Sequence, residues 1–152
     1  MELRKWRRPA FIKPEISGKE YGNIMHAVMQ HICYEKCIDE AAIRMEISRL
    51  VDSGFLTQEQ AKFVDLGKLW RFFTSDIGNK LRNGVPYLRE FKFSILECGS
   101  QYDPSLDGEQ ILLQGVVDCA LLEEDGITVV DFKTDYATEE MLDKIISRYQ
   151  IQ

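Results

Sequence analysis

Cysteine is scarce in this chain of 152 residues, and its four cysteines form no paired C-x-x-C spacing. The lack of such pairs argues against a zinc ribbon, and we expect reduced thiols with neither zinc nor an iron–sulfur cluster. Cys33 and Cys37 stand one helical turn apart, which suits either a metal site or two half-buried core thiols, and we favour core thiols. Cys119 should point to the packed face of a strand, because it alternates there with Asp118.

Long apolar runs are missing as well. No stretch approaches the roughly 20 apolar residues of a membrane-spanning helix. Residues 1–9 include four basic side chains but lack the apolar segment of a secretory signal. A hydrophobic content of 45% with 29% charged residues is typical of a globular protein. We therefore expect a cytoplasmic protein of one domain, without a membrane partner.

Positive charge is in short supply, because 19 Lys and Arg residues face 25 Asp and Glu residues and the net charge is −6. Such a balance argues mildly against a free-standing nucleic-acid binder, since contacts to phosphate need lysine and arginine. It does not exclude a nuclease, because the acids of an active site raise the negative count. A domain of a larger protein can also take its DNA affinity from its neighbours.

The most informative pattern is a pair of predicted strands that carries two carboxylates and a lysine: Asp118, Asp131 and Lys133. The acidic run at residues 123–126 ends in Asp-Gly, which tolerates a tight turn and therefore predicts an antiparallel hairpin. Asp131 and Lys133 share one face of their strand. Two hairpin registers remain open, with Asp118 opposite either Lys133 or Asp131, and both put the three groups on one side.

These three groups suit metal-assisted cleavage of a phosphodiester. Two carboxylates held close together repel each other, and a divalent cation makes both ionised forms tolerable. Carboxylate oxygens suit Mg²⁺ or Mn²⁺. The lysine adds a positive charge that can hold an attacking water or meet the charge that grows on a phosphate. The plain alternative is a hairpin whose solvent face carries an Asp–Lys cross-strand pair.

Periodicity divides the chain into an irregular linker at residues 1–16, a helical half and a half rich in strands. Ser17 and Glu20 have the spacing of a capping box, and Thr57 is predicted to cap a third helix. The apolar stripe of the last helix stops at Gln152, which suggests a fragment of a longer protein. We expect helices near residues 19–36, 38–52, 66–83 and from 138 onward, and strands near 87–96, 110–122 and 127–133.

Three further side chains and one glycine are candidates for the site. His26 lies on the first predicted helix, roughly 140° from the centre of its apolar stripe, and so points away from the main core. Gly22 lies one turn earlier on nearly the same side, where a strand or substrate can approach because no side chain intervenes. His31 faces elsewhere, so the two histidines are poorly placed to bind one metal together. For Glu90, on the first strand, we favour a solvated position over a role in the site.

Four ordered motifs together resemble the PD-(D/E)XK nuclease family in its RecB-like branch, and within it the C-terminal nuclease domain of AddA-type subunits. Ordered motifs at suitable spacings are far more specific than a single D-x-K. The resemblance runs from about Arg7 to the end of the chain. The motifs are Gly22-(x)3-His26, Gly115-(x)2-Asp118, Asp131-Phe132-Lys133-Thr134-Asp135 and Tyr149-Gln150-Ile151-Gln152.

The resemblance implies a fold and a chemistry. The fold is a restriction-endonuclease-like α/β core at residues 17–152, in which a mixed central β-sheet is flanked by helices. The implied reaction is hydrolysis of a DNA phosphodiester. Mg²⁺ (or Mn²⁺) would be bound by His26, Asp118, Asp131 and the backbone carbonyl of Phe132, while Lys133 would position the attacking water.

The last motif matches the family only in part. Gln152 fits the glutamine that follows the catalytic strand in the family, and Gly22 and Tyr149 are candidates for contacts to DNA or to the metal ligands. The family's tyrosine, four residues after the glutamine, would lie beyond Gln152. We therefore expect a nuclease domain that is truncated at its C-terminal helix.

The resemblance also implies partners. Single-stranded DNA ends would be delivered by a helicase motor, and an AddB-like subunit would take part in processing double-strand breaks for recombination. One alternative is a non-catalytic DNA- or protein-binding scaffold module of the same fold. Another is a small protein–protein interaction domain whose acidic hairpin is a solvated surface.

Overall fold

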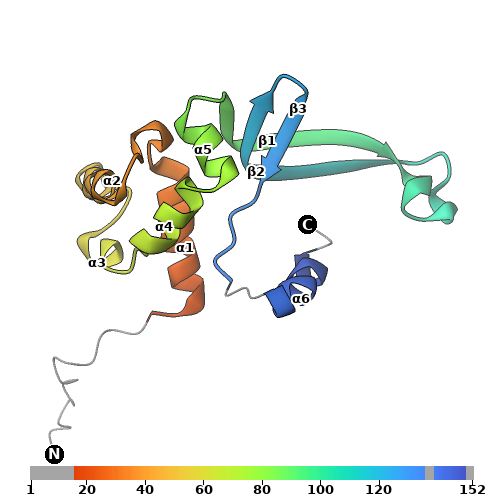
Figure 1. Cartoon of the computed structure of the whole chain (residues 1–152). Helices are drawn as coiled ribbons and strands as arrows, with labels where there is room; N and C mark the ends of the chain where they lie inside the picture. Colours follow the sequence, from red (N-terminus) through yellow and green to blue (C-terminus); the bar gives the residue numbers. More distant parts are fainter. Residues whose placement is uncertain (1–15, 136–138, 150–152) are drawn as a thin grey trace, which may run out of the picture.

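Most helices of this chain precede the sheet and one follows it, as the sequence predicts. The computed structural model describes residues 16–135 and 139–149 (Figure 1). The helical half holds α1 (Gly18–His31), the 3₁₀ turn η1 (Tyr34–Lys36), α2 (Glu40–Asp52), α3 (Gln58–Ala61), α4 (Leu66–Phe73) and α5 (Asp76–Arg82). The second half holds the strands β1 (Tyr87–Cys98), β2 (Gln110–Glu123) and β3 (Gly126–Val130), the 3₁₀ turns η2 (Gly99–Gln101) and η3 (Pro104–Leu106), and α6 (Glu139–Tyr149). The predicted α/β class is confirmed.

The helices begin where the sequence places their caps. The Ser17 side chain accepts the N–H of Glu20 at 3.1 Å, and the Glu20 carboxylate accepts the N–H of Ser17 at 2.9 Å. This is the predicted capping box of α1. Thr57 caps α3 in the same reciprocal way with Gln60. Local hydrogen bonding therefore fixes the start of both helices.

Two predicted helices are wrong in their extent. The helix expected over residues 19–36 stops at His31, because the backbone at Ile32 is extended and the chain then turns into η1. The helix expected over residues 66–83 is interrupted after α4. There Ser75 takes an extended conformation and accepts the N–H of Gly78 at 3.2 Å, which starts α5 afresh.

The three strands form one antiparallel sheet in the order β1-β2-β3. The resemblance implies a mixed sheet, which would also contain a parallel strand. The residues that the structure describes form only antiparallel pairs. β3 pairs only with the part of β2 next to the hairpin turn, from Cys119 to Glu123. β1 and β2 therefore continue past β3 as a two-stranded arm with η2 and η3 at its tip (Figure 1).

The hairpin register decides between the two predicted arrangements. Glu123 pairs with Gly126, so the turn consists of residues 124–125, one position earlier than the Asp-Gly pair. The pairing of Cys119 with Val130 leads on to Asp118 beside Asp131, and the register with Asp118 opposite Lys133 is wrong. The strand expected over residues 127–133 also ends early, at Val130, so Asp131 lies just beyond β3.

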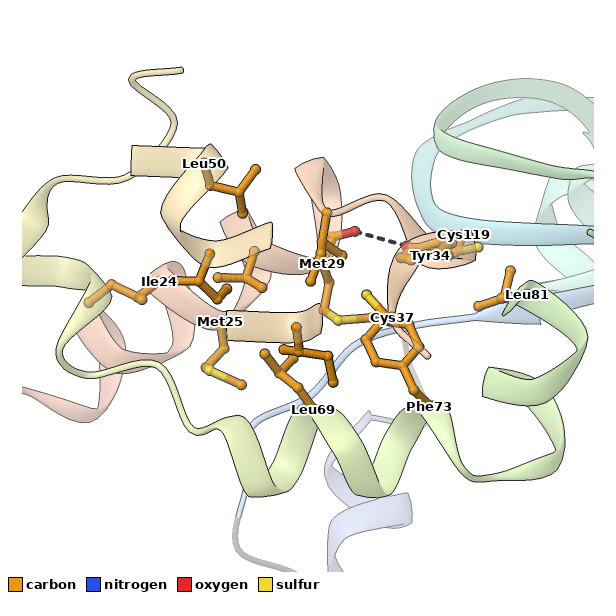
Figure 2. Packing of buried hydrophobic residues seen from close by; sticks show 14 of the residues in the cluster. Ile24, Met25, Met29, Tyr34, Cys37, Leu50, Leu69, Phe73, Leu81 and Cys119 are labelled. Carbon is orange, nitrogen blue, oxygen red and sulfur yellow. Dashed lines mark hydrogen bonds between the residues drawn. The ribbon is translucent and has the colours of Figure 1, made fainter. Parts of the chain in front are cut away.

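The hydrophobic core lies between the helices and one end of the sheet. Most of its buried side chains come from α1, η1, α2, α4 and α5 (Figure 2), the connecting residues Ile32, Cys37 and Leu56 add to them, and β2 contributes Cys119 and Leu121. Within it the buried Tyr34 hydroxyl donates to the Met29 carbonyl at 2.8 Å (Figure 2). Cys37 is also buried and Cys33 half-buried, as predicted for core thiols. Cys119 occupies the packed face of its strand, as expected.

The final helix, α6, is present as predicted, but its apolar side chains are not packed. Met141, Leu142 and Ile146 are each about half exposed. An ion pair of 3.3 Å between Arg148 and Asp135 joins α6 to the segment after β3. Gln152 lies outside the described residues. Across the part of the chain that is described, no helix has the length and apolar character needed to cross a membrane.

Candidate active site

The site begins with a contact between α1 and β2. His26 Nε2 lies 3.1 Å from Asp118 Oδ1, although the two residues are 92 positions apart in the sequence. The buried residues of α1 are Ile24, Met25, Val28 and Met29. His26 projects from another side of the helix and keeps 39% of its side chain exposed, while Asp118 keeps only 14%. The histidine that the sequence directed away from the core therefore meets the first of the predicted acids.

The second oxygen of Asp118 holds the segment that follows β3. Asp118 Oδ2 accepts the backbone N–H of Phe132 at 2.8 Å. Phe132 in turn packs edge-on against Phe72 of α4, with ring centroids 5.5 Å apart. One half-buried carboxylate thus contacts both α1 and residues 131–133, and it fixes their positions relative to β2.

Glu90 completes a cluster that the sequence did not indicate. Its Oε1 lies 3.8 Å from His26 Nε2, and ligand atoms of His26, Glu90 and Asp118 all lie within 4.8 Å of one another. The prediction of a solvated Glu90 is therefore wrong. Its backbone has φ of 48°, a left-handed conformation that few glutamates adopt, so the alternation of an ordinary strand does not describe its side chain.

The register explains why Glu90 reaches this place. Arg89 pairs with Cys119 and Phe91 with Val117, which puts Glu90 level with Asp118 across β1 and β2. Arg89 also donates to the carbonyls of Gln30 and Ile32 at the end of α1, at 2.8 Å and 2.5 Å. The guanidinium therefore ties β1 to α1 next to the cluster, where a cation also suits the helix C-terminus.

Asp131 and Lys133 form a separate pair at the edge of this cluster. Lys133 Nζ lies 2.8 Å from Asp131 Oδ2, and the Asp131 side chain is 53% exposed. Asp131 is not among the three groups whose ligand atoms converge. The structure thus forms two pairs, His26 with Asp118 and Asp131 with Lys133. Phe132 connects them, because its N–H donates to Asp118 and it lies between the two residues of the second pair.

At Gly22, α1 approaches the segment after β3 closely. A Cβ atom on Gly22 would lie 3.2 Å from Thr134 Oγ1, a separation tighter than ordinary packing. Any larger side chain there would push against the residues that carry Lys133. Tyr149 ends α6, beyond the residues whose side chains are described, and the position of Gln152 is not described either.

The second histidine has no place in this cluster. His31 stacks on Phe55, with ring centroids 4.0 Å apart. Burial, together with the nearby charges of Arg89 and Arg49, lowers the pKa of His31 below its usual value. His31 therefore packs against Phe55, and it is not among the residues whose ligand atoms converge with those of His26.

Two hollows open from the site. A groove of about 860 Å³ runs along β2 and includes Phe93, Tyr102, Asp118, Asp131 and Lys133 in its lining. A smaller hollow of about 230 Å³ lies on the other side, between α1, α4 and residues 130–134, and His26, Asp131 and Lys133 line it. Asp118, Asp131 and Lys133 are therefore accessible from the groove, which is large enough for part of an extended polymer backbone.

Comparison with known proteins identifies the family. A model of the PD-(D/E)XK nuclease superfamily matches residues 2–152. This chain belongs to the PD-(D/E)XK nuclease superfamily. The membership predicted from the four motifs is thereby confirmed.

Named relatives of this PD-(D/E)XK domain are large proteins. The chain is 36% identical over 159 residues to the A subunit of the ATP-dependent helicase/nuclease of Clostridium botulinum strain Hall, an alignment that covers 100% of the chain and 12% of the relative. It is 36% identical over 160 residues to the protein of the same name from Clostridium perfringens, which covers 96% of the chain and 12% of that relative. The PD-(D/E)XK domain thus spans about an eighth of the length of these helicase/nuclease relatives.

Proposed function

We propose that this PD-(D/E)XK domain hydrolyses DNA phosphodiester bonds with the help of a divalent cation, Mg²⁺ or Mn²⁺. The observation that carries the proposal is the contact between His26 and Asp118, with Glu90 beside them and all three sets of ligand atoms within 4.8 Å. These three groups come from three elements, and each can offer an atom to one ion. A cross-strand Asp–Lys pair on a solvent face would not need such a cluster.

The donors fit a hard divalent ion. The cluster offers two carboxylates and one imidazole, and a cation would offset the repulsion between the two acids. The resemblance adds Asp131 and the Phe132 carbonyl as further ligands, and these residues adjoin Asp118 through its bond to the Phe132 N–H. When bound, the ion would activate a water molecule and offset the charge that develops on the phosphate.

Each residue of the site has a defined task in this proposal. Asp118 holds His26 and residue 132 in place, so the ligands are arranged before a substrate arrives. Lys133, which pairs with Asp131, lines the groove along β2. There it can position the attacking water and stabilise negative charge on the phosphate.

The parent protein is part of the proposal. We infer that the chain serves as the nuclease domain of an AddA-like helicase/nuclease, acting in the cytoplasm on ends of broken DNA during recombination. The support is the identity to two helicase/nuclease proteins, of which the chain spans 12%. A helicase motor would deliver single-stranded ends, and an AddB-like subunit would be the partner.

Cleavage of an end-labelled single-stranded oligonucleotide tests this proposal. We expect Mn²⁺-dependent cleavage that EDTA abolishes, and a loss of at least about 100-fold in Lys133→Ala, because a group that stabilises developing charge is worth this much. Lys92→Ala is the matched control, since Lys92 is an exposed lysine of β1 outside both hollows. Cleavage that survives equally in both variants would contradict the role of Lys133. No cleavage by the unaltered chain would favour the non-catalytic scaffold.

A further inference from the structure

A third hollow adjoins the site on the side of α4, and we call it the basic hollow. It measures about 510 Å³ and lies between Lys68 and Arg71 of α4 and residues 133–135 after β3. Lys133 lines both the basic hollow and the groove along β2. The two spaces therefore meet at the lysine of the site.

The charge of the basic hollow is opposite to that of the chain. The net charge of the chain is −6, yet three of the residues around this space are the cations Lys68, Arg71 and Lys133. Its one acid, Asp135, lies 3.3 Å from Arg148 of α6, and Lys133 lies 2.8 Å from Asp131. The excess positive charge of the hollow therefore comes from Lys68 and Arg71. The groove along β2, by contrast, has two acids and only Lys133 as a cation, with apolar and aromatic walls.

Two of these cations stand together on one helix, α4. Lys68 and Arg71 are three positions apart on α4 and share a face, where like charges cost a few tenths of a kcal/mol. Neither forms an ion pair with any carboxylate in the described part of the chain. Arg71 is exposed, and Lys68 Nζ lies 5.1 Å from the centre of the Tyr21 ring, so this contact is with a neutral ring and not with an acid.

We propose that Lys68 and Arg71 bind the phosphate backbone of single-stranded DNA next to the bond that is cut. This inference rests on the proposed function, because the shared Lys133 makes the basic hollow a continuation of the cleavage site. A strand whose scissile phosphate lies at Lys133 meets the two cations of α4 with a neighbouring phosphate. Phosphate is the anion that repeats along a polymer and that arginine and lysine recognise in extended grooves.

The test compares the double variant Lys68→Ala/Arg71→Ala with the unaltered chain. Binding of a fluorescent oligothymidine is measured by anisotropy in EDTA over a series of salt concentrations, so that no cleavage takes place. Each contact to phosphate contributes about 0.7 to the slope of log K against log salt for single strands, so we expect the slope to fall by about 1.4. If the affinities converge near 1 M salt, binding at about 0.1 M weakens on the order of 25-fold.

The matched control is Arg44→Ala/Lys62→Ala, which removes the same charge from exposed sites on α2 and after α3, outside the basic hollow. A loss confined to the Lys68→Ala/Arg71→Ala variant supports the inference. Equal losses in the two double variants, no loss in either, or no binding by the unaltered chain would each overturn it. Metal-dependent cleavage that needs Lys133 would leave the nuclease proposal standing in all of these cases, so the two failures are distinguishable.

Discussion

At the scale of single residues, Gly22 controls how closely α1 approaches the segment that carries Lys133. In Gly22→Ala the new methyl group would lie 3.2 Å from Thr134 Oγ1. Alanine favours the helix by up to about 1 kcal/mol, which offsets part of the crowding. We therefore expect a change in unfolding free energy within about 1 kcal/mol, together with a severalfold loss of cleavage rate. Urea unfolding and cleavage kinetics measure the two effects.

The control for this change is Gly18→Ala in the same helix, where a Cβ atom would meet nothing within 4 Å. Gly18→Ala should leave the cleavage rate unaltered. If Gly22→Ala cleaves as fast as Gly18→Ala, the close approach to Thr134 has no part in placing Lys133.

Glu46 makes the stability of the folded chain depend on pH. Its buried carboxylate accepts hydrogen bonds from Arg49 and from the N–H of Cys33, and those bonds, with the Arg49 bonds foremost, lower the pKa of Glu46. A lowered carboxyl pKa contributes stability above the ordinary value of 4.5, and this stability is lost as the pH falls through the folded pKa. Glu46→Gln should therefore cost about 1–3 kcal/mol at pH 7 and much less near pH 3.

Urea unfolding at the two pH values measures this difference. Glu124→Gln, in the exposed turn between β2 and β3, is the control and should cost within about 0.5 kcal/mol at either pH. A cost of Glu46→Gln that is the same at pH 3 as at pH 7 would refute the proposed contribution of the ionised carboxylate.

At the scale of elements, the corner between α4 and α5 depends on Gly78. A Cβ atom there would lie 2.0 Å from the Phe72 carbonyl oxygen and 2.6 Å from the Phe73 Cα, both of which belong to the backbone of α4. Backbone cannot move aside as the end of a side chain can. Gly78→Ala should therefore destabilise the chain by about 3 kcal/mol or more and shift α4.

Gly67→Ala is the matched control on α4, because its Cβ would stand at an ordinary 3.5 Å from the nearest atom, in Asp65. It should be neutral or stabilising by up to about 1 kcal/mol. Thermal unfolding of both variants measures the contrast. Equal melting temperatures would show that α4 and α5 do not need this close contact.

Element starts and the direction of His26 were predictable because they depend on local sequence. The capping boxes at Ser17 and Thr57 involve residues three positions apart, and the helical period alone turns His26 away from the core stripe. The position of Glu90 was not predictable. It depends on a left-handed backbone and on the register between two strands, neither of which is encoded in the alternation of polar and apolar residues.

The same limit explains the other errors. The turn of the hairpin lies one residue before the Asp-Gly pair, because the pairing of β2 with β3, and not the preference of the turn residues, sets the register. The break between α4 and α5 follows from packing at Gly78 and from the cap at Ser75, which an apolar helical pattern conceals. Asp131 pairs with Lys133 and does not join the cluster around Asp118, because β3 ends at Val130 and Asp131 lies beyond the strand.

At the scale of the whole molecule, the site unites two halves that differ in structure. The helical half supplies His26, and the sheet supplies Glu90 and Asp118, so the proposed ligands meet only when both halves are folded. An ion that binds the folded chain but not the unfolded chain stabilises the fold by mass action. Metal binding and folding should therefore be coupled in this protein.

The most direct test of the proposed metal centre is the binding of Mn²⁺ by isothermal titration calorimetry, with the unaltered chain and with Asp118→Asn. Asparagine keeps an oxygen for the Phe132 N–H but removes the charge. We predict that the unaltered chain binds Mn²⁺ and gains about 2.7 kcal/mol of stability at 100 times the dissociation constant. Asp118→Asn should lose both effects, while Asp125→Asn, in the exposed turn, should keep them. Equal Mn²⁺ binding by Asp118→Asn and the unaltered chain would contradict a metal centre at His26 and Asp118.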